Sequence, residues 1–233
     1  LVLAIGAFDG LHLGHEKVIR TAKDLASAHG AKTGVMRFHP HPSRVLAPED
    51  APPLLCSEDQ IPGLLARQGV DLHLRLPFSR ELAGQEPEAF LSELFGGVPD
   101  LKGVVVGPNW HFGHRGRGDG AMLKAEAERR GIAVVIADPV EWEGGLVSST
   151  RIREALARGD LASATHMLDR HYTLHGAVGP GKKYGRELGF PTANFAPLKT
   201  LVPRPGVYAM KVHVDGTDYA GAGYITHEPL LVE

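Results

Sequence analysis

Cysteine is almost absent from this sequence, because Cys56 is the only one in 233 residues. A disulfide framework and a cysteine-based zinc site are therefore excluded within this chain. No apolar run reaches the roughly 18–20 residues of a membrane-spanning helix, and we expect no signal peptide. The formal net charge of −2 provides no basic field for nucleic acid or an anionic membrane. We therefore expect a cytoplasmic enzyme with small-molecule partners and without a nucleic-acid or membrane partner. A homo-oligomer is compatible with the sequence.

Two catalytic motifs are also missing. The chain has no Walker motif GxxxxGK[ST], which argues against an ordinary P-loop kinase. It has no G-x-S-x-G, and no catalytic partner adjoins Cys56 in sequence, so no nucleophile–base pair is evident. The remaining chemistry is positioning and charge stabilisation. That chemistry suits in-line attack on phosphorus with magnesium and without a covalent intermediate.

Strands alternate with helices from residue 1 to residue 157. Residues 1–5 and 33–38 read as buried strands, and residues 16–29 between them carry apolar side chains at helical spacing. The order strand, helix, strand predicts a right-handed parallel crossover, and hence an α/β domain with a parallel sheet. Further helices are expected at 57–68, 87–95, 121–130 and 148–157, and further strands at 71–76, 101–106 and 132–137.

The pattern changes after Gly159. From His171 onward, short runs of alternating character are separated by glycine and proline, as in YTLHGAV, GVYAMKVHV and YAGAGYI. This pattern predicts antiparallel strands that form a small β-barrel. We therefore expect one domain over residues 1–165 and a second over residues 171–233. Both ends are expected to be cuts in a longer protein, which would leave the second domain incomplete.

The first fifteen residues, LVLAIGAFDGLHLGH, point to an anion site. A buried strand passes through a glycine-rich turn into a helix, where free N–H groups and the helix dipole favour phosphate. His12 and His15 would lie on one face of the first helical turn and donate to phosphate oxygens. Asp9 could orient a histidine or a magnesium-bound water. The alternative interpretation of the two histidines is a solvated helix start. The glycines that allow close backbone approach are Gly6, Gly10 and Gly14.

Two further loops carry polar and cationic residues at a strand end and at a helix start. In GPNWHFGHRGRGDG (107–120), Asn109 and His111 follow a buried strand, and two arginines among glycines suit phosphate recognition. In SSTRIR (148–153), hydroxyls at a helix N-terminus can cap the helix and bind phosphate oxygens. For the first loop the alternative is a mobile solvated loop. For the second it is an ordinary N-cap with surface arginines. The second loop offers Ser149, Thr150 and Arg153.

Residues 179–194, GPGKKYGRELGFPTAN, predict a third site. Their glycines and cations make a flexible basic segment that suits phosphates. Thr192 and Asn194 would point to one side of an extended segment, and their hydroxyl and amide oxygens are hard ligands suited to magnesium. From the residues alone, a basic β-turn explains the same stretch. The phosphate-binding residues expected here are Gly179, Gly181, Lys182, Gly185 and Arg186.

These stretches together carry a family resemblance. GAFDGLHLGH resembles the GxFDGxHxGH signature of nucleotidylyltransferases. With FHPHP, VGPNWHFG and SSTRIR, it looks like the N-terminal half of the bacterial bifunctional riboflavin kinase/FMN adenylyltransferases (FAD synthetases). GRELGFPTAN resembles the flavokinase signature, and the chain departs from the family at His111, where members often carry arginine. The resemblance implies a Rossmann-like adenylyltransferase domain with a parallel sheet, followed by a six-stranded β-barrel kinase domain.

The resemblance also implies activities and roles. Riboflavin and ATP would give FMN in the second domain, and FMN and ATP would give FAD and pyrophosphate in the first. His12 and His15 would stabilise the ATP phosphates during adenylyl transfer. Thr192 and Asn194 would bind the Mg²⁺ of ATP, and Glu233 would be the base on the riboflavin 5′-hydroxyl. The nucleotide-binding residues would be Gly6, Phe8, Asp9, Gly10, Gly14, Asn109, Ser149, Thr150 and Arg153, together with Gly179, Gly181, Lys182, Gly185 and Arg186.

The resemblance leaves other details open. It predicts that residues are missing near 224–230 and after 233. Phe38, His39 and the turn 40–42 are candidates for contacts with the flavin ring. One alternative is a nucleotidylyltransferase of the same fold with another phosphate acceptor, and a second is a flavin- or nucleotide-binding regulator with inactive sites. A third is a metal-binding protein, suggested by 13 histidines, although their scatter forms no closed ligand set.

Overall fold

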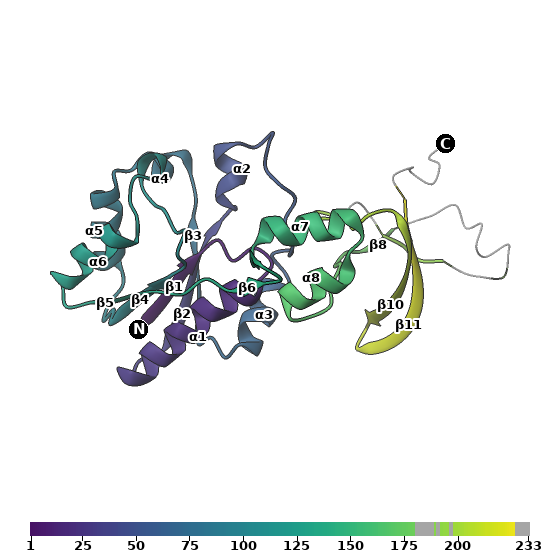
Figure 1. Cartoon of the computed structure of the whole chain (residues 1–233), viewed down its shortest axis with the longest axis horizontal. Helices are drawn as coiled ribbons and strands as arrows, with labels where there is room; N and C mark the ends of the chain where they lie inside the picture. The colour runs from purple at the N-terminus through teal and green to yellow at the C-terminus, as the bar shows by residue number, and fades with distance from the viewer. Residues whose placement is uncertain (180–188, 190–191, 196–197, 227–233) are drawn as a thin grey trace.

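The computed structural model describes residues 1–179, 189, 192–195 and 198–226 (Figure 1). Its largest part is a five-stranded parallel sheet in the order β3-β2-β1-β4-β5. This order confirms the expected Rossmann-like α/β arrangement, because the strand order reverses beside β1. The strands are β1 (Val2–Gly6), β2 (Thr33–His39), β3 (Leu72–Pro77), β4 (Gly103–Val106) and β5 (Ala133–Ile136).

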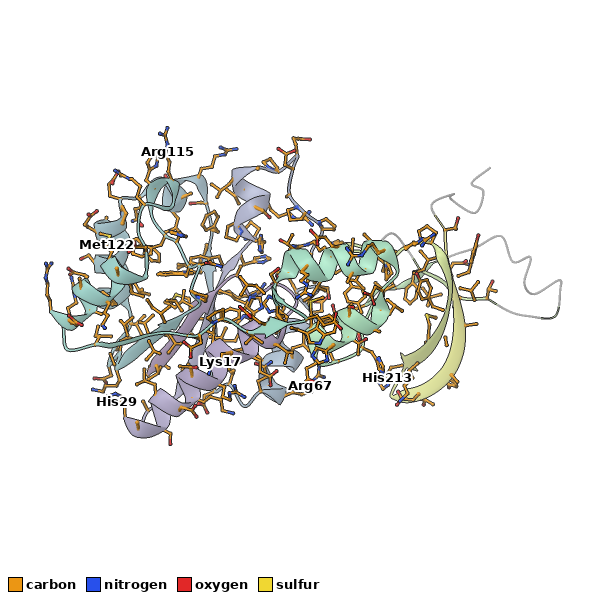
Figure 2. The ribbon with its side chains drawn as sticks, in the orientation of Figure 1. Lys17, His29, Arg67, Arg115, Met122 and His213 are labelled. Carbon is orange, nitrogen blue, oxygen red and sulfur yellow. The ribbon has the colours of Figure 1, made fainter. Side chains whose placement is uncertain are left out.

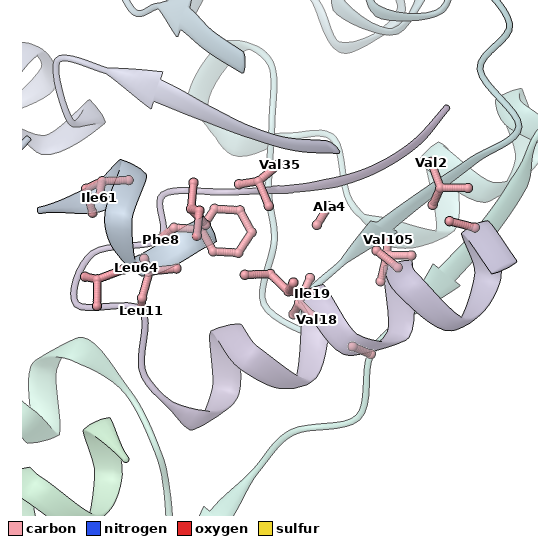
Figure 3. Close-up of a cluster of buried hydrophobic side chains, with 14 of the residues drawn as sticks. Val2, Ala4, Phe8, Leu11, Val18, Ile19, Val35, Ile61, Leu64 and Val105 are labelled. Carbon is pink, nitrogen blue, oxygen red and sulfur yellow. The ribbon is translucent and has the colours of Figure 1, made fainter. Parts of the chain in front are cut away.

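Both faces of this sheet are covered by helices. Alternate residues of a strand point to opposite faces, so β1 sends Val2 and Ala4 to one side and Leu3 and Ile5 to the other. The first side packs against α1 (Leu13–Ala28) and α3 (Ile61–Arg67), as Figure 3 shows for Val18, Ile19 and Ile61. The second side packs against α5 (Pro87–Gly97) and α6 (Gly120–Glu128). The largely apolar sequences of the three central strands, β1, β2 and β4, follow from this burial on two faces.

The expected helices and strands of the first half are present, with shifted ends. The helix expected over 57–68 begins only at Ile61, because the turn before it is closed by Gln60, whose Oε1 accepts from the Ser57 backbone N–H at 2.8 Å. The sequence pattern missed three short helical segments, since a single turn carries no periodicity. They are α2 (Pro42–Leu46), α4 (Arg80–Gly84) and the 3₁₀ turn η1 (His114–Gly116).

A helical pair joins the sheet domain to the C-terminal strands. The helices α7 (Ser149–Arg158) and α8 (Leu161–Leu168) lie between the parallel sheet and the C-terminal hairpin in Figure 1. Their buried side chains form a separate apolar cluster with Leu55, Tyr172 and Leu201. The small hairpin β6 (Glu141–Trp142) and β7 (Gly145–Leu146) precedes α7. Helix α8 crosses residue 165, the expected end of the first domain, in a stretch where the sequence pattern predicted no element.

The C-terminal part is antiparallel, as expected. β10 (Gly206–Val214) pairs with β11 (Thr217–Ile225) across a two-residue turn, and β8 (Val178–Gly179) pairs with β9 (Asn194–Phe195). The turn residues Asp215 and Gly216 both have positive φ, as the tight turns of two-residue hairpins require. Within the described residues these strands form two separate two-stranded sheets, so the closed barrel stays a prediction.

None of the helices in the part of the chain that the structure describes has both the length and the apolar character needed to cross a membrane.

Candidate functional site

A cavity of about 490 Å³ opens beside the carboxyl ends of β1 and β4. This is the point where the strand order reverses, and ligands of open parallel sheets bind in the crevice outside such a point. Six predicted site residues line the cavity, from the loops after β1 and β4. They are Gly6, Phe8, His12, Gly14, His15 and Asn109.

The two histidines are stacked at the start of α1. Their ring centroids lie 3.7 Å apart with an interplanar angle of 17°, which confirms that both imidazoles share one face. His12 is the N-cap, and its Nδ1 accepts from the backbone N–H of His15 at 3.4 Å. Because Nδ1 accepts, a neutral His12 carries its proton on Nε2, where it is a donor. A Cβ at Gly14 would lie 3.1 Å from the His12 ring, so a side chain at this position would crowd the imidazole, and glycine leaves room for it.

Both imidazoles are kept uncharged. Burial, reinforced by the nearby charge of Arg170, lowers the pKa of His12 to about 4. Burial and the neighbouring His12 lower the pKa of His15 well below its usual range. Near neutral pH the pair therefore acts through neutral N–H donors rather than through positive charge.

Asp9 holds the turn before the histidines to distant parts of the chain. Its Oδ1 accepts from the Leu55 backbone N–H at 2.8 Å, and its Oδ2 forms an ion pair with Arg153. The Ser149 hydroxyl donates to the Asp9 carbonyl at 2.8 Å. Burial raises the pKa of the Asp9 carboxyl, and Arg153 opposes this rise. Ser149 and Arg153, expected to hold nucleotide, thus contact the turn behind the cavity, while Thr150 is exposed at the start of α7.

The loop after β4 supplies aromatic walls as well as polar groups. Asn109 is exposed at the cavity, and Trp110 stacks on Phe112 with ring centroids 4.7 Å apart. Neither arginine of this loop is among the residues that line the histidine cavity, although Arg115 lies in the wall of a neighbouring cavity. Arg117 pairs with Glu86, and Figure 2 shows Arg115 extending from the edge of the molecule.

A second cavity of about 420 Å³ adjoins the first. The two cavities share Phe38, Pro42 and His111 in their walls. Sequence reasoning anticipated the Phe38–Pro42 end of this cavity and singled out the loop of His111, but it did not indicate the other apolar walls. Those walls include Phe78, Leu82, Phe90 and Phe112, of which only Phe112 lies in a stretch that the sequence analysis had singled out, residues 107–120.

Three of the predicted kinase-site residues lie in the part of the chain that the structure describes. Gly179 and Asn194 face each other in the β8–β9 pair, and Thr192 is exposed just before β9. The other predictions, Gly181, Lys182, Gly185, Arg186 and Glu233, lie outside the described residues. Among the described residues, no group of three or more His, Cys, Asp or Glu side chains is arranged to hold a metal ion.

Comparison with known proteins decides the family. The FAD synthetase model matches residues 1–151, and the riboflavin kinase model matches residues 168–233. A bifunctional riboflavin kinase/FMN adenylyltransferase from Listeria monocytogenes is 37% identical over 227 residues, which cover 96% of this chain and 71% of that protein. The chain belongs to the bifunctional riboflavin kinase/FMN adenylyltransferase family. A member from Bacillus subtilis is 35% identical over 235 residues, covering 100% of this chain and 73% of that protein.

The fold agrees with a solved structure. A crystal structure described as a macrolide-efflux protein from Streptococcus pneumoniae superposes with a TM-score of 0.86 at 30% identity. The match covers 97% of this chain and 73% of that one. The first of the family's two models ends near the start of α7, and the second begins at the end of α8.

Proposed function

We propose that this chain makes FAD from riboflavin in two ATP-dependent steps, as a riboflavin kinase and an FMN adenylyltransferase. The N-terminal site transfers the adenylyl group of ATP to FMN and releases pyrophosphate. The C-terminal strands carry the kinase site that forms FMN. The domain limits of 1–165 and 171–233 belong to this proposal, as do a cytoplasmic location and small-molecule partners.

The observation that carries the adenylyl-transfer step is the pair of adjoining cavities. The cavity at the histidines fits ATP, because neutral N–H donors and a helix N-terminus meet there. The neighbouring cavity has mainly apolar and aromatic walls, which suit a flat flavin ring. The common wall of Phe38, Pro42 and His111 would then separate the ring from the nucleotide while their phosphates meet at its edge.

The chemistry needs no protein nucleophile. A phosphate oxygen of FMN attacks the α-phosphorus of ATP, a new P–O bond forms, and the bond to the pyrophosphate oxygen breaks. The His12 Nε2–H is placed to donate to a phosphate oxygen whose negative charge grows in the transition state. A preformed neutral donor suits this role because its stacking on His15 fixes it before ATP arrives.

Magnesium belongs to the proposal at the kinase site. Asn194 lies in an extended strand and Thr192 two residues earlier, so their oxygens can share one side. A hydroxyl and an amide oxygen fit a hard cation, which would neutralise charge on the ATP phosphates there. Glu233 as the base, and Gly179, Gly181, Lys182, Gly185 and Arg186 as phosphate contacts, remain proposals for that site.

The test uses flavin chromatography after incubation with magnesium, ATP and FMN. We expect FAD from the unaltered chain, and His15→Ala should lower its rate of formation by at least about 100-fold, because it removes one N–H donor of the pair and the ring that fixes the His12 donor by stacking. The matched control is His29→Ala, because His29 is exposed at the far end of the same helix (Figure 2). Absence of FAD with the unaltered chain, or equal rates for both variants, would contradict the proposal.

A further inference from the structure

Arg170 makes hydrogen bonds to the backbone of the histidine loop, to the end of α8 and to the Cys56 sulfur. Its Nη1 donates to the Leu11 carbonyl at 3.1 Å and to the Leu168 carbonyl at 2.9 Å, and its Nη2 donates to the Gly10 carbonyl. No carboxylate in the described residues forms an ion pair with it. The guanidinium fork therefore connects the end of α8 to the two residues that directly precede His12.

The turn that Arg170 holds has an unfavourable backbone. Leu11 has φ of 42° and Phe8 has φ of 53°, although neither is glycine. Such conformations cost of the order of 1–3 kcal/mol each and persist only where the surrounding structure enforces them. Three successive carbonyls of the turn accept hydrogen bonds from side chains: Asp9 from Ser149, and Gly10 and Leu11 from Arg170. Arg170 thus supplies two of these three restraints.

Arg170 also comes from an unexpected part of the chain. It lies outside residues 1–151, which the FAD synthetase model matches, and inside residues 168–233, which the riboflavin kinase model matches. Two residues later, the Tyr172 hydroxyl donates to the Leu201 carbonyl at 2.7 Å, within the C-terminal part. The same short segment therefore contacts both halves of the molecule.

We propose that Arg170 is a positioning residue for adenylyl transfer, which fixes the Gly10–Leu11 turn so that the His12 Nε2–H meets the ATP phosphates. The inference rests on the proposed function of the histidine site. It implies that this site is incomplete in residues 1–151 and requires the segment after α8. A consistent electrostatic effect accompanies the geometry, because the Arg170 charge helps to lower the pKa of both histidines.

The test compares Arg170→Gln, Arg170→Lys and the control Arg158→Gln in the whole chain, with FAD formation from FMN as the assay. For Arg170→Gln we expect kcat to fall by about 10- to 100-fold, because small misplacements of catalytic groups have effects of this size. KM for ATP and for FMN should stay within about threefold, since the cavity walls are unchanged. Arg170→Lys should lose part of kcat, because one ammonium cannot bridge two carbonyls as the fork does. Arg158 is exposed at the end of α7, and its variant should match the unaltered chain.

Each outcome has a separate meaning. An unchanged kcat for Arg170→Gln would overturn the inference. Full activity of Arg170→Lys beside a slow Arg170→Gln would also overturn it, because charge rather than bridging would then be responsible. Near-UV circular dichroism reports whether each variant is folded, and a loss of kcat that only tracks the unfolded fraction would count against positioning. If Arg170→Gln does not fold, the kcat of Arg170→Lys decides. Failure of the unaltered chain to make FAD would reject the proposed function instead.

Discussion

Neutral buried imidazoles are the distinctive residues of this site. His12 is 6% exposed, and its lone pair on Nδ1 caps α1, so a proton there would cost both solvation and the cap. Burial also lowers the pKa of His41 and of His73. In the proposed mechanism, an uncharged donor pair can stabilise a phosphate because the donors are oriented before the substrate binds. The same burial makes the folded state sensitive to acid.

The free energy of unfolding should therefore fall as pH drops from about 6.5 to about 4. The unfolded chain binds a proton on His12 near its ordinary pKa, whereas the folded chain does so only near pH 4. His12 alone would then contribute a loss of about 3 kcal/mol across this window, since each pKa unit corresponds to about 1.4 kcal/mol. Urea unfolding at several pH values measures this loss in the free energy of unfolding.

His12→Asn provides the control for that prediction. Asparagine keeps a side-chain oxygen for the His15 N–H, so the helix cap survives while the titrating group is removed. We expect stability at pH 7.5 to change by less than about 1 kcal/mol, which is the usual size of a cap effect. The decline between pH 6.5 and pH 4 should become shallower. A decline as steep as that of the unaltered chain would show that His12 is not the responsible group.

At the scale of elements, the site is built from loops held against rigid helices. The loop after β4 is fixed to the start of α5 at Gly113, whose φ is 73°. A Cβ at this position would lie 2.6 to 2.8 Å from side-chain and backbone atoms of Pro87. No flexible group lies there to move aside, so only glycine fits this contact. The contact also places Phe112 and His111 in the walls of the proposed flavin cavity.

Gly113→Ala should consequently weaken flavin binding. We expect a loss of about 1–3 kcal/mol in stability from overpacking and backbone strain, and a KM for FMN raised more than the KM for ATP. Gly131→Ala is the matched control, because Gly131 also has positive φ, 67°, but its Cβ would meet open space. It should carry only the smaller backbone cost of about 1 kcal/mol and leave both KM values unchanged. Thermal unfolding and FAD-formation kinetics measure the two effects, and equal KM changes in both variants would count against this account of the cavity.

At the scale of the whole molecule, the two proposed sites lie in different parts of the chain. The histidine cavity lies at the parallel sheet, whereas Thr192 and Asn194 lie beside the C-terminal strands. Helices α7 and α8 lie between them (Figure 1). Each half needs its own ATP, so the two reactions should respond to separate substitutions.

Thr192→Ala should slow the formation of FMN from riboflavin while FAD formation from added FMN stays unchanged. Loss of the proposed magnesium ligand would remove charge neutralisation at the transferred phosphate, and metal-site changes of this kind typically cost 10- to 100-fold or more. The control is Thr217→Ala, because Thr217 is exposed at the start of β11, whereas Thr200 is buried. This control should leave the rate of FMN formation unchanged. An undiminished rate of FMN formation would remove Thr192 from the magnesium site.

Some of this protein follows directly from local sequence. The parallel sheet was predictable because its three central strands, β1, β2 and β4, are short, largely apolar runs that burial on two faces explains, and because strands alternate with helices. The stacked histidines were predictable because a glycine-rich turn between strand and helix brings residues three apart onto one face. Hairpin β10–β11 was predictable from alternating residues around an Asp-Gly turn.

Other features depend on contacts that no local pattern encodes. One-turn helices such as α2 have no periodicity to detect. Helix α8 was not predicted because its eight residues are too few for a clear helical periodicity. Ser149 and Arg153 stay predicted phosphate ligands, but the sequence pattern did not indicate their contacts with Asp9, which lies 140 and 144 residues away.

The sequence by itself therefore determined the type of sheet, the family and the identity of the two histidines, because these depend on short-range periodicity and motif spacing. Only the tertiary structure decided how the histidines are held and what surrounds them. Arg170 reaches the histidine turn across 159 and 160 residues, and Phe38 meets His111 in a common wall of two cavities. Such positions are set by the packing of whole helices and strands, which bring together residues that the chain itself keeps far apart.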